Sequence, residues 1–221
     1  MGDTYSSGIA FVFEGDTEKI FYHTLLSYFL SKYPECSLEK RTDEKTGETF
    51  HVLSSNGKSI LIKDNVVGTV SQISNSGAWF SNRCYKENKS IGWTVFLCYD
   101  TDSYNNDITK IMDGDWIDLR KSIEKNRNCK VIDLAAHADI EDIILLDSES
   151  VFKFIGIAPV PIPTKGKKGK RKMKMLFRMK GNGSAYHEGK RAEPLIQSLD
   201  FEKIMSKSTI PFFEIENKCF K

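Results

Sequence analysis

The sequence predicts an α/β protein in which a mostly parallel sheet is flanked by helices. Two apolar runs, residues 9–13 and 93–99, have the composition of strands that are buried on both faces of a sheet. Each run ends in acidic residues. A third strand over residues 130–135 and helical segments between the runs produce the strand-helix alternation that is typical of parallel α/β folds.

The first strand leads into the first helix. Residues 9–13 end at Glu14, and apolar residues then continue at helical spacing as far as Leu30. The first turn of this helix carries Asp16 and Glu18, whose negative charge is favoured near the positive end of the helix dipole. We therefore expect Glu14 at a strand-to-helix turn.

The middle of the chain adds further elements. Residues 36–64 alternate polar and apolar side chains between turn signals, which predicts an inserted β meander. Residues 66–80 are weakly helical and residues 116–126 form a clearer helix. Asp139 is suited to cap a helix that starts directly after the third strand.

The chain is expected to form one catalytic domain over residues 1–158. Residues 159–221 supply a basic segment and C-terminal helices, around 194–199 and 212–219, that pack on the same domain. A length of 221 residues suits this organisation, since domains of about 100–200 residues are usual.

Composition narrows the class of protein. Hydrophobic residues make up 40% of the chain and charged residues 28%, as in globular domains. No apolar run approaches the roughly 20 residues that cross a bilayer, and the N-terminal residues lack a basic signal, so we expect a cytoplasmic protein without a membrane partner. The five cysteines form no CxxC pair, which favours reduced thiols over disulfides or a zinc site.

Positive charge is concentrated in one segment. The net charge is only +2, but residues 165–180 contain nine of the 32 basic residues and no acidic one. The rest of the chain then has 23 basic against 30 acidic residues. We expect an exposed, mobile loop or hairpin that contacts the phosphates of a nucleic acid. The candidate contacts are Lys167, Lys168, Lys170, Arg171, Lys172, Lys174 and Lys180.

Acidic residues follow two of the predicted strands. Glu14 ends the first strand, and Asp100 and Asp102 end the strand over residues 93–99. In open α/β sheets the ligand site lies beyond the carboxyl ends of the strands. Converging carboxylates repel one another unless a cation neutralises them, so the pattern predicts a shared Mg²⁺ or Mn²⁺ site. Glu18, one helical turn after Glu14, is a further candidate ligand.

The segments around these acids resemble a known family. Residues 11–18, residues 96–103 and the acidic helix start at residues 139–141 look like the TOPRIM fold, in particular its RloB-like and OLD-type nuclease branches. The resemblance spans about residues 8–146. It implies that the α/β fold is TOPRIM-like.

The resemblance also implies roles for the acidic residues. Glu14 would act in acid–base chemistry or in metal binding, and Asp100 and Asp102 would hold the metal. Glu18 and Glu141 match positions of further acidic ligands. The activity implied is metal-dependent hydrolysis of phosphodiester bonds in DNA or RNA, in a nuclease of antiviral defence against phage.

A basic residue is expected to stabilise the transition state of such a reaction. Lys190 and Lys180 are the candidates, with His187 nearby, and we place Lys190 among the catalytic residues.

Two other functions compete with the nuclease. One is a nucleic-acid-binding or regulatory subunit whose acidic pocket is vestigial. The other is a nucleotide-processing enzyme, which is disfavoured because no GxxxxGK[ST] loop is present. The sequence leaves open whether a partner ATPase is needed and whether the chain forms homo-oligomers.

Overall fold

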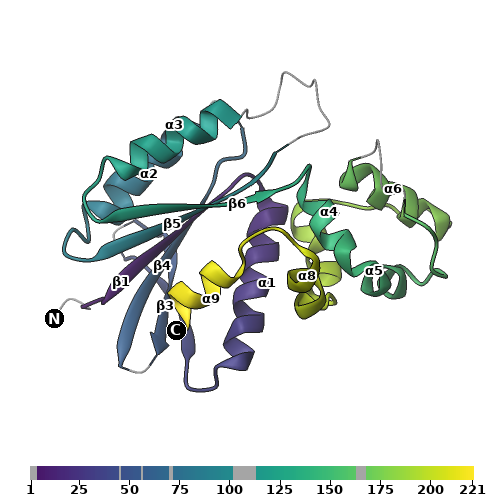
Figure 1. Ribbon diagram of the computed structural model, residues 1–221, viewed down its shortest axis with the longest axis horizontal. Coiled ribbons are helices and arrows are strands. Elements are labelled where there is room, and N and C mark those ends of the chain that lie inside the picture. Colours follow the sequence, from purple (N-terminus) through teal and green to yellow (C-terminus); the bar gives the residue numbers. More distant parts are fainter. Residues whose placement is uncertain (1–3, 45, 56, 70–71, 102–112, 163–167) are drawn as a thin grey trace.

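A six-stranded mixed sheet forms the centre of the protein, with helices on both faces (Figure 1). The computed structural model describes residues 4–44, 46–55, 57–69, 72–101, 113–162 and 168–221. The strand order is β2-β3-β4-β1-β5-β6. The strands are β1 (Ser7–Phe13), β2 (Ser37–Thr42), β3 (Thr49–Ser55), β4 (Lys58–Val66), β5 (Gly92–Asp100) and β6 (Cys129–Ala136).

The helices divide into those before and those after β6. The first group is α1 (Asp16–Lys32), α2 (Ile73–Trp79), the π-helix η2 (Phe80–Tyr85) and α3 (Asp113–Glu124). The second group is α4 (Ile140–Ile144), η3 (Leu145–Asp147), α5 (Ser148–Ile155), α6 (Gly169–Met179), η4 (Gly189–Ala192), α7 (Glu193–Gln197), α8 (Phe201–Lys207) and α9 (Phe213–Cys219).

The sheet has a parallel half and an antiparallel half. β1 pairs in parallel with β4 and β5, and β5 pairs in parallel with β6. β2, β3 and β4 form an antiparallel meander. The α/β class is confirmed, and the meander lies where it was expected. Because β4 pairs directly with β1, the meander is an integral part of the sheet and not only an insertion.

β1 is the central strand, and both of its faces are buried. Ile9, Phe11 and Phe13 pack into the core beneath α1, α4 and the C-terminal helices, while Ala10 and Val12 pack into a second core. The second core lies beneath α2, η2 and α3, on the opposite face (Figure 1). The two-sided burial explains why this strand is a continuous apolar run and does not alternate. Trp93 and Trp116 are both buried in the second core.

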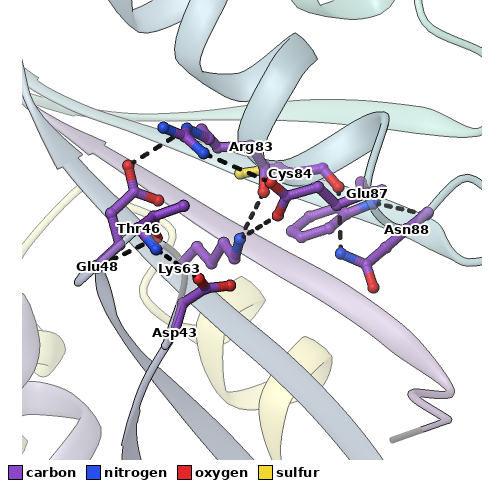
Figure 2. A network of polar contacts seen from close by, with 9 residues as sticks. Asp43, Thr46, Glu48, Lys63, Arg83, Cys84, Glu87 and Asn88 are labelled. Atoms are coloured by element: carbon purple, nitrogen blue, oxygen red, sulfur yellow. Dashed lines mark hydrogen bonds and ion pairs between the residues drawn. The ribbon is translucent and has the colours of Figure 1, made fainter. Parts of the chain in front are cut away.

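A polar network joins the meander to η2 (Figure 2). Lys63 of β4 is only 8% exposed, and its ammonium donates to the carbonyl of Arg83 at 2.5 Å and to Glu87 at 2.9 Å. Arg83 in turn lies 3.6 Å from the carboxylate of Glu48. A buried ammonium needs such partners, so these contacts fix the position of η2 over the sheet.

The basic segment differs from the expectation. Residues 169–179 form helix α6 and not an exposed loop or hairpin. Met173 and Leu176 of this helix are buried in the core, and apolar burial at helical spacing is what fixes the segment. Lys167 lies outside the described residues.

No helix in the described part of the chain combines the length and the apolar character needed to cross a lipid bilayer. The five cysteines are all free thiols, and four of them are buried.

Candidate active site

A cavity of about 700 Å³ opens where β1, β5 and β6 end. Seven acidic residues line it: Glu14, Asp16, Glu18, Asp100, Asp139, Glu141 and Glu188. The size is within the usual range for small-ligand sites. The structure therefore brings together four of the five expected acidic residues. The fifth, Asp102, lies outside the described residues.

The backbone around Glu14 is fixed by the sheet. Its amide donates to the carbonyl of Cys98 at 2.9 Å, and its carbonyl accepts from Gly68 at 2.9 Å. The Glu14 carboxyl oxygen Oε2 accepts a hydrogen bond from the amide of Asp100 at 3.0 Å. The ends of β1 and β5 are thereby joined through this side chain, as expected of two parallel strands that end at the same edge.

Asp100 has an unusual environment. Its Oδ1 atom is buried and has no hydrogen-bond partner among the described residues. Burial, followed by the charges of Glu18 and Glu14, raises the pKa of Asp100 well above its usual value. A buried carboxyl oxygen without a partner carries a free-energy penalty, and Asp100 pays it in the wall of the cavity.

Glu18 lies in the first turn of α1 and is only 6% exposed. Burial, opposed by backbone hydrogen bonds and reinforced by Glu14 and Glu141, raises its pKa to about 8. The start of α1 is held against η4, because the amide of Gly189 donates to Thr17 Oγ1 at 2.9 Å. Glu18 is therefore protonated at neutral pH in a fixed position.

Glu141 lies at the start of α4 and is 3% exposed. The hydroxyl of Tyr186 donates to its Oε1 at 2.9 Å. Burial and the charge of Asp139 raise the pKa of Glu141 to about 7, while the hydrogen bond from Tyr186 lowers it. Glu141 therefore changes its protonation state near neutral pH.

Asp139 caps α4 and also accepts a hydrogen bond from the backbone at the start of α6. Its Oδ1 accepts from the amide of Asp142 at 3.1 Å, which confirms the expected cap, and its Oδ2 accepts from the amide of Lys170 at 3.1 Å. The amide of Gly169 donates to Asp142 at 3.1 Å. Two carboxylates thus satisfy amides at the N-terminus of α6 that no helical carbonyl can reach.

Some of the expected basic residues line the cavity, one is buried, and others are exposed away from it. Lys168 and Lys170 line the cavity, and Lys170 forms an ion pair with Glu188. Lys172 is only 7% exposed and pairs with Asp142 at 2.6 Å, which separates it from the exposed basic residues of α6. Lys190 is exposed and does not line the cavity, although its neighbour Gly189 does. Lys180 and His187 are exposed outside the cavity as well.

Sequence reasoning missed three contributors to the site. Asp139 was expected only as a helix cap, and Tyr186 and Gly169 were not considered. The acidic helix start at residues 139–141 was a usable signal for Asp139. Nothing in the local sequence indicates that Tyr186, 45 residues after Glu141, reaches its carboxyl group.

Comparisons with known proteins give no family. No protein-family model matches the chain, and no curated protein matches it. Among solved structures, a futalosine hydrolase mutant from Helicobacter pylori is 8% identical, with a TM-score of 0.30 and coverage of 98% of this chain and 99% of the other. An MTAN from Helicobacter pylori is 11% identical, with a TM-score of 0.29 and coverage of 96% and 99%. An S-adenosylhomocysteine nucleosidase from Streptococcus pyogenes is 10% identical, with a TM-score of 0.27 and coverage of 89% and 79%.

These comparisons correct the family expectation. The structures found are nucleosidases and a futalosine hydrolase, not TOPRIM nucleases, so the TOPRIM, RloB-like and OLD-type resemblance is withdrawn. The phosphodiester nuclease, the role in antiviral defence and the Mg²⁺ or Mn²⁺ cofactor are withdrawn with it. At TM-scores of 0.27–0.30, the likeness does not transfer the neighbours' own activity to this chain.

The cation argument from the sequence has an alternative in the structure. That argument assumed that all the converging carboxyl groups are ionised. Burial instead raises the pKa values of Glu18, Asp100 and Glu141, and protonation relieves much of their mutual repulsion.

Proposed function

We propose that the acidic cavity is the active site of a hydrolase that cleaves a glycosidic bond by carboxyl acid–base catalysis. The observation that carries the proposal is the convergence of Glu14, Glu18, Asp100 and Glu141 on one cavity. No Lys or Arg among the described residues forms an ion pair with Glu18, Asp100 or Glu141. The cavity wall is therefore rich in acidic groups that remain available for chemistry.

The choice of bond follows from the charge that develops during the reaction. Glycosidic hydrolysis proceeds through an oxocarbenium-like transition state, in which the sugar carries positive charge. Carboxyl groups of the wall that are ionised stabilise that charge.

The two glutamates with pKa values near neutrality fit the two proton transfers. Glu18, with a pKa of about 8, is protonated at pH 7 and donates its proton to the leaving group as the bond to the sugar breaks. Glu141, with a pKa of about 7, accepts a proton from the water that attacks the sugar. The products are the protonated leaving group and a sugar with a new hydroxyl. Proton exchange with solvent then restores both glutamates.

The remaining acids serve the same reaction. Glu14 and Asp100 are linked by the hydrogen bond from the Asp100 amide, and both face the cavity. We assign Glu14 to maintenance of the high pKa of Glu18, to which its charge contributes, and Asp100, whose own pKa is raised, to hydrogen bonding with the sugar.

The basic helix next to the cavity suggests the substrate class. Lys168 and Lys170 line the wall, and α6 continues with the exposed side chains of Arg171, Lys174 and Arg178. We propose that these residues bind phosphates, so that the sugar belongs to a nucleotide or a nucleic acid. The proposed partner is therefore a nucleotide or a nucleic acid.

A substrate panel tests this function. The purified chain is incubated with nucleosides, nucleotides, single-stranded DNA and RNA, and both free bases and shortened strands are measured by chromatography. Release of a base from an intact backbone is the expected result. Strand cleavage without base release would contradict the proposal.

Glu18→Gln is the decisive variant. It keeps the shape of the side chain but cannot donate a proton, so kcat should fall by about 10²–10⁴-fold. Substrates whose leaving group needs no protonation, such as aryl glycosides with an acidic phenol, should lose far less. Equal losses on both kinds of substrate would argue against Glu18 as the general acid.

A further inference from the structure

A second cluster of ionisable side chains lies away from the acidic cavity, between α1 and the meander. It consists of His23 from α1, His51 from β3 and Asp64 from β4. In the sheet, His51 lies opposite Ile62, two residues before Asp64, so the two side chains are diagonal neighbours on one face. α1 crosses this face and presents His23 to it. Three elements far apart in sequence therefore meet here.

The contacts within the cluster are close. His23 Nε2 lies 3.1 Å from Asp64 Oδ2, and the rings of His23 and His51 are 5.5 Å apart between centroids. One ligand atom from each of the three residues lies within 4.8 Å of the other two. The side chain of Asp64 is only 12% exposed and that of His23 is 29% exposed. The group is thus partly shielded but reachable from solvent.

The other oxygen of Asp64 has its own partner. Lys19 Nζ lies 2.5 Å from Asp64 Oδ1. Lys19 and His23 are one turn apart on α1, so both reach the same carboxylate. This contact leaves Oδ2 directed toward the histidines and fixes the orientation of the carboxylate, as outer contacts of metal ligands do.

The protonation states suit metal ligation. Burial would raise the pKa of Asp64, but hydrogen bonds from His23 and Lys19 hold that pKa below its usual value. Burial, together with the charge of His23, lowers the pKa of His51. At neutral pH, Asp64 is therefore an anion, and the His51 ring is neutral with a free lone pair.

We propose that His23, His51 and Asp64 bind a divalent transition-metal ion of the zinc type. Two imidazole nitrogens and one carboxylate oxygen form a donor set that suits Zn²⁺, whereas Mg²⁺ and Ca²⁺ prefer oxygen donors. Tetrahedral coordination with bonds of about 2.1 Å places ligand atoms about 3.4 Å apart. Small side-chain rotations bring atoms within 4.8 Å to that spacing. Water would complete the coordination.

An ion pair alone is the simpler interpretation. Lys19, Asp64 and His23 already form a satisfied network without a metal. That network leaves His51 unexplained, because its ring makes no hydrogen bond to any described residue although it is half-buried against His23. A shared metal ion accounts for the position of both rings. The site shares no residue with the acidic cavity, so it does not depend on the proposed hydrolysis.

Zinc titration tests the site. The full chain is freed of metal with a chelator and titrated with Zn²⁺ by calorimetry, and the melting temperature is measured with and without Zn²⁺. We expect one ion per chain at this site and a melting temperature that rises with Zn²⁺ concentration. His51→Gln and Asp64→Asn should each weaken binding at least about tenfold.

Controls separate this site from other donors. His187→Gln changes an exposed histidine outside the cluster and should bind Zn²⁺ as the wild type does. Co²⁺ replaces Zn²⁺ in a second titration, because a thiolate-to-cobalt charge-transfer band would reveal cysteine ligands. Such a band, or equal Zn²⁺ binding by wild type and His51→Gln, would overturn the proposal. The fold of each variant is checked by melting in chelator, and His23→Gln supplies an independent ligand loss.

Discussion

Neighbouring side chains in the first two turns of α1 meet opposite electrostatic environments. Glu18 faces the acidic cavity, where burial and two other glutamates raise its pKa to about 8. Lys19, the next residue, faces Asp64, whose pKa is held low by Lys19 and His23. The two pKa shifts have opposite signs because Asp64 has positively charged partners and Glu18 has none among the described residues. One side of α1 therefore carries a buried, uncompensated carboxyl group and the other an ion-pair network.

Tyr186 provides a test at the scale of one hydrogen bond. Its hydroxyl stabilises the ionised form of Glu141 and so lowers the pKa of that carboxyl. Tyr186→Phe should raise the pKa of Glu141, so the base becomes active only at higher pH. The acidic limb of the pH profile of kcat/KM should then shift to higher pH. Tyr28→Phe, at a residue that does not line the cavity, is the control and should leave the profile in place. An unshifted profile for Tyr186→Phe would remove Glu141 from the role of base.

At the scale of elements, the packing of α6 against α4 depends on the missing side chain of Gly169. A Cβ atom at Gly169 would lie 2.3 Å from Asp139 Oδ1 and 2.3 Å from the amide nitrogen of Asp142. Only glycine permits the close approach through which α4 and α6 exchange hydrogen bonds. The same approach brings Lys170 to the cavity wall.

Gly169→Ala should therefore destabilise the fold, by about 1–3 kcal/mol as overpacked sites do. Gly114→Ala is a matched control, since it lies in α3 with open space around the new Cβ. That change should be neutral or stabilising by up to about 1 kcal/mol, given the helix propensities of the two residues. Urea denaturation of both variants gives the comparison. Equal effects would mean that α6 is not held at Gly169.

The exposed face of α6 permits a test of nucleic-acid binding. Four of its basic side chains are exposed: Arg171, Lys174, Arg178 and, just after the helix, Lys180. If they contact phosphates, replacing all four with Gln should flatten the log-log salt dependence of binding by about 0.9 per lost contact on duplex DNA, or about 0.7 on a single strand. Removal of four exposed lysines on other elements, Lys58, Lys89, Lys125 and Lys218, controls for net charge. Identical slopes for the two variants would exclude α6 as the binding surface.

The elements differ in how well the sequence predicted them. β1 and β5 were recognised because strands buried on both faces must be apolar throughout, and this pattern is local. β6, at the edge of the sheet, was recognised from its short apolar run. α6 was not recognised, because its many lysines and arginines concealed the buried positions Met173 and Leu176. α8 was missed as well, and it is a short helix whose burial depends on distant partners.

At the scale of the whole molecule, the cavity is assembled by long-range contacts that a sequence cannot display. The carboxyl ends of β1 and β5 could be predicted to meet, and they did bring Glu14 and Asp100 together. The contact from Tyr186 to Glu141 depends on how residues after α6 return to α4. The protonation of the acids depends on burial, which is also a tertiary property. The convergence of Glu14 and Asp100 could thus be predicted, whereas the burial that sets the pKa values of these acids could not.

Clustered acids of this kind also affect the stability of the whole protein. The pKa of Glu18 is raised from 4.5 to about 8, so between these values the native state binds more protons than the unfolded state. The free energy of unfolding therefore falls as pH rises through this window. Glu141 acts in the same direction, with a pKa of about 7. Groups with lowered pKa values, such as Asp64, act in the opposite direction but only at lower pH.

Glu18→Gln should consequently flatten the pH dependence of stability. We expect the variant to be close to the wild type at pH 5 and more stable above pH 8, by about 2–4 kcal/mol. Urea denaturation between pH 5 and pH 9 measures the difference, and Glu35→Gln, at an exposed position, should follow the wild-type curve throughout. A variant that parallels the wild type over the whole range would show that Glu18 is ionised in the native protein at neutral pH. It would then lack the proton that the proposed hydrolysis requires.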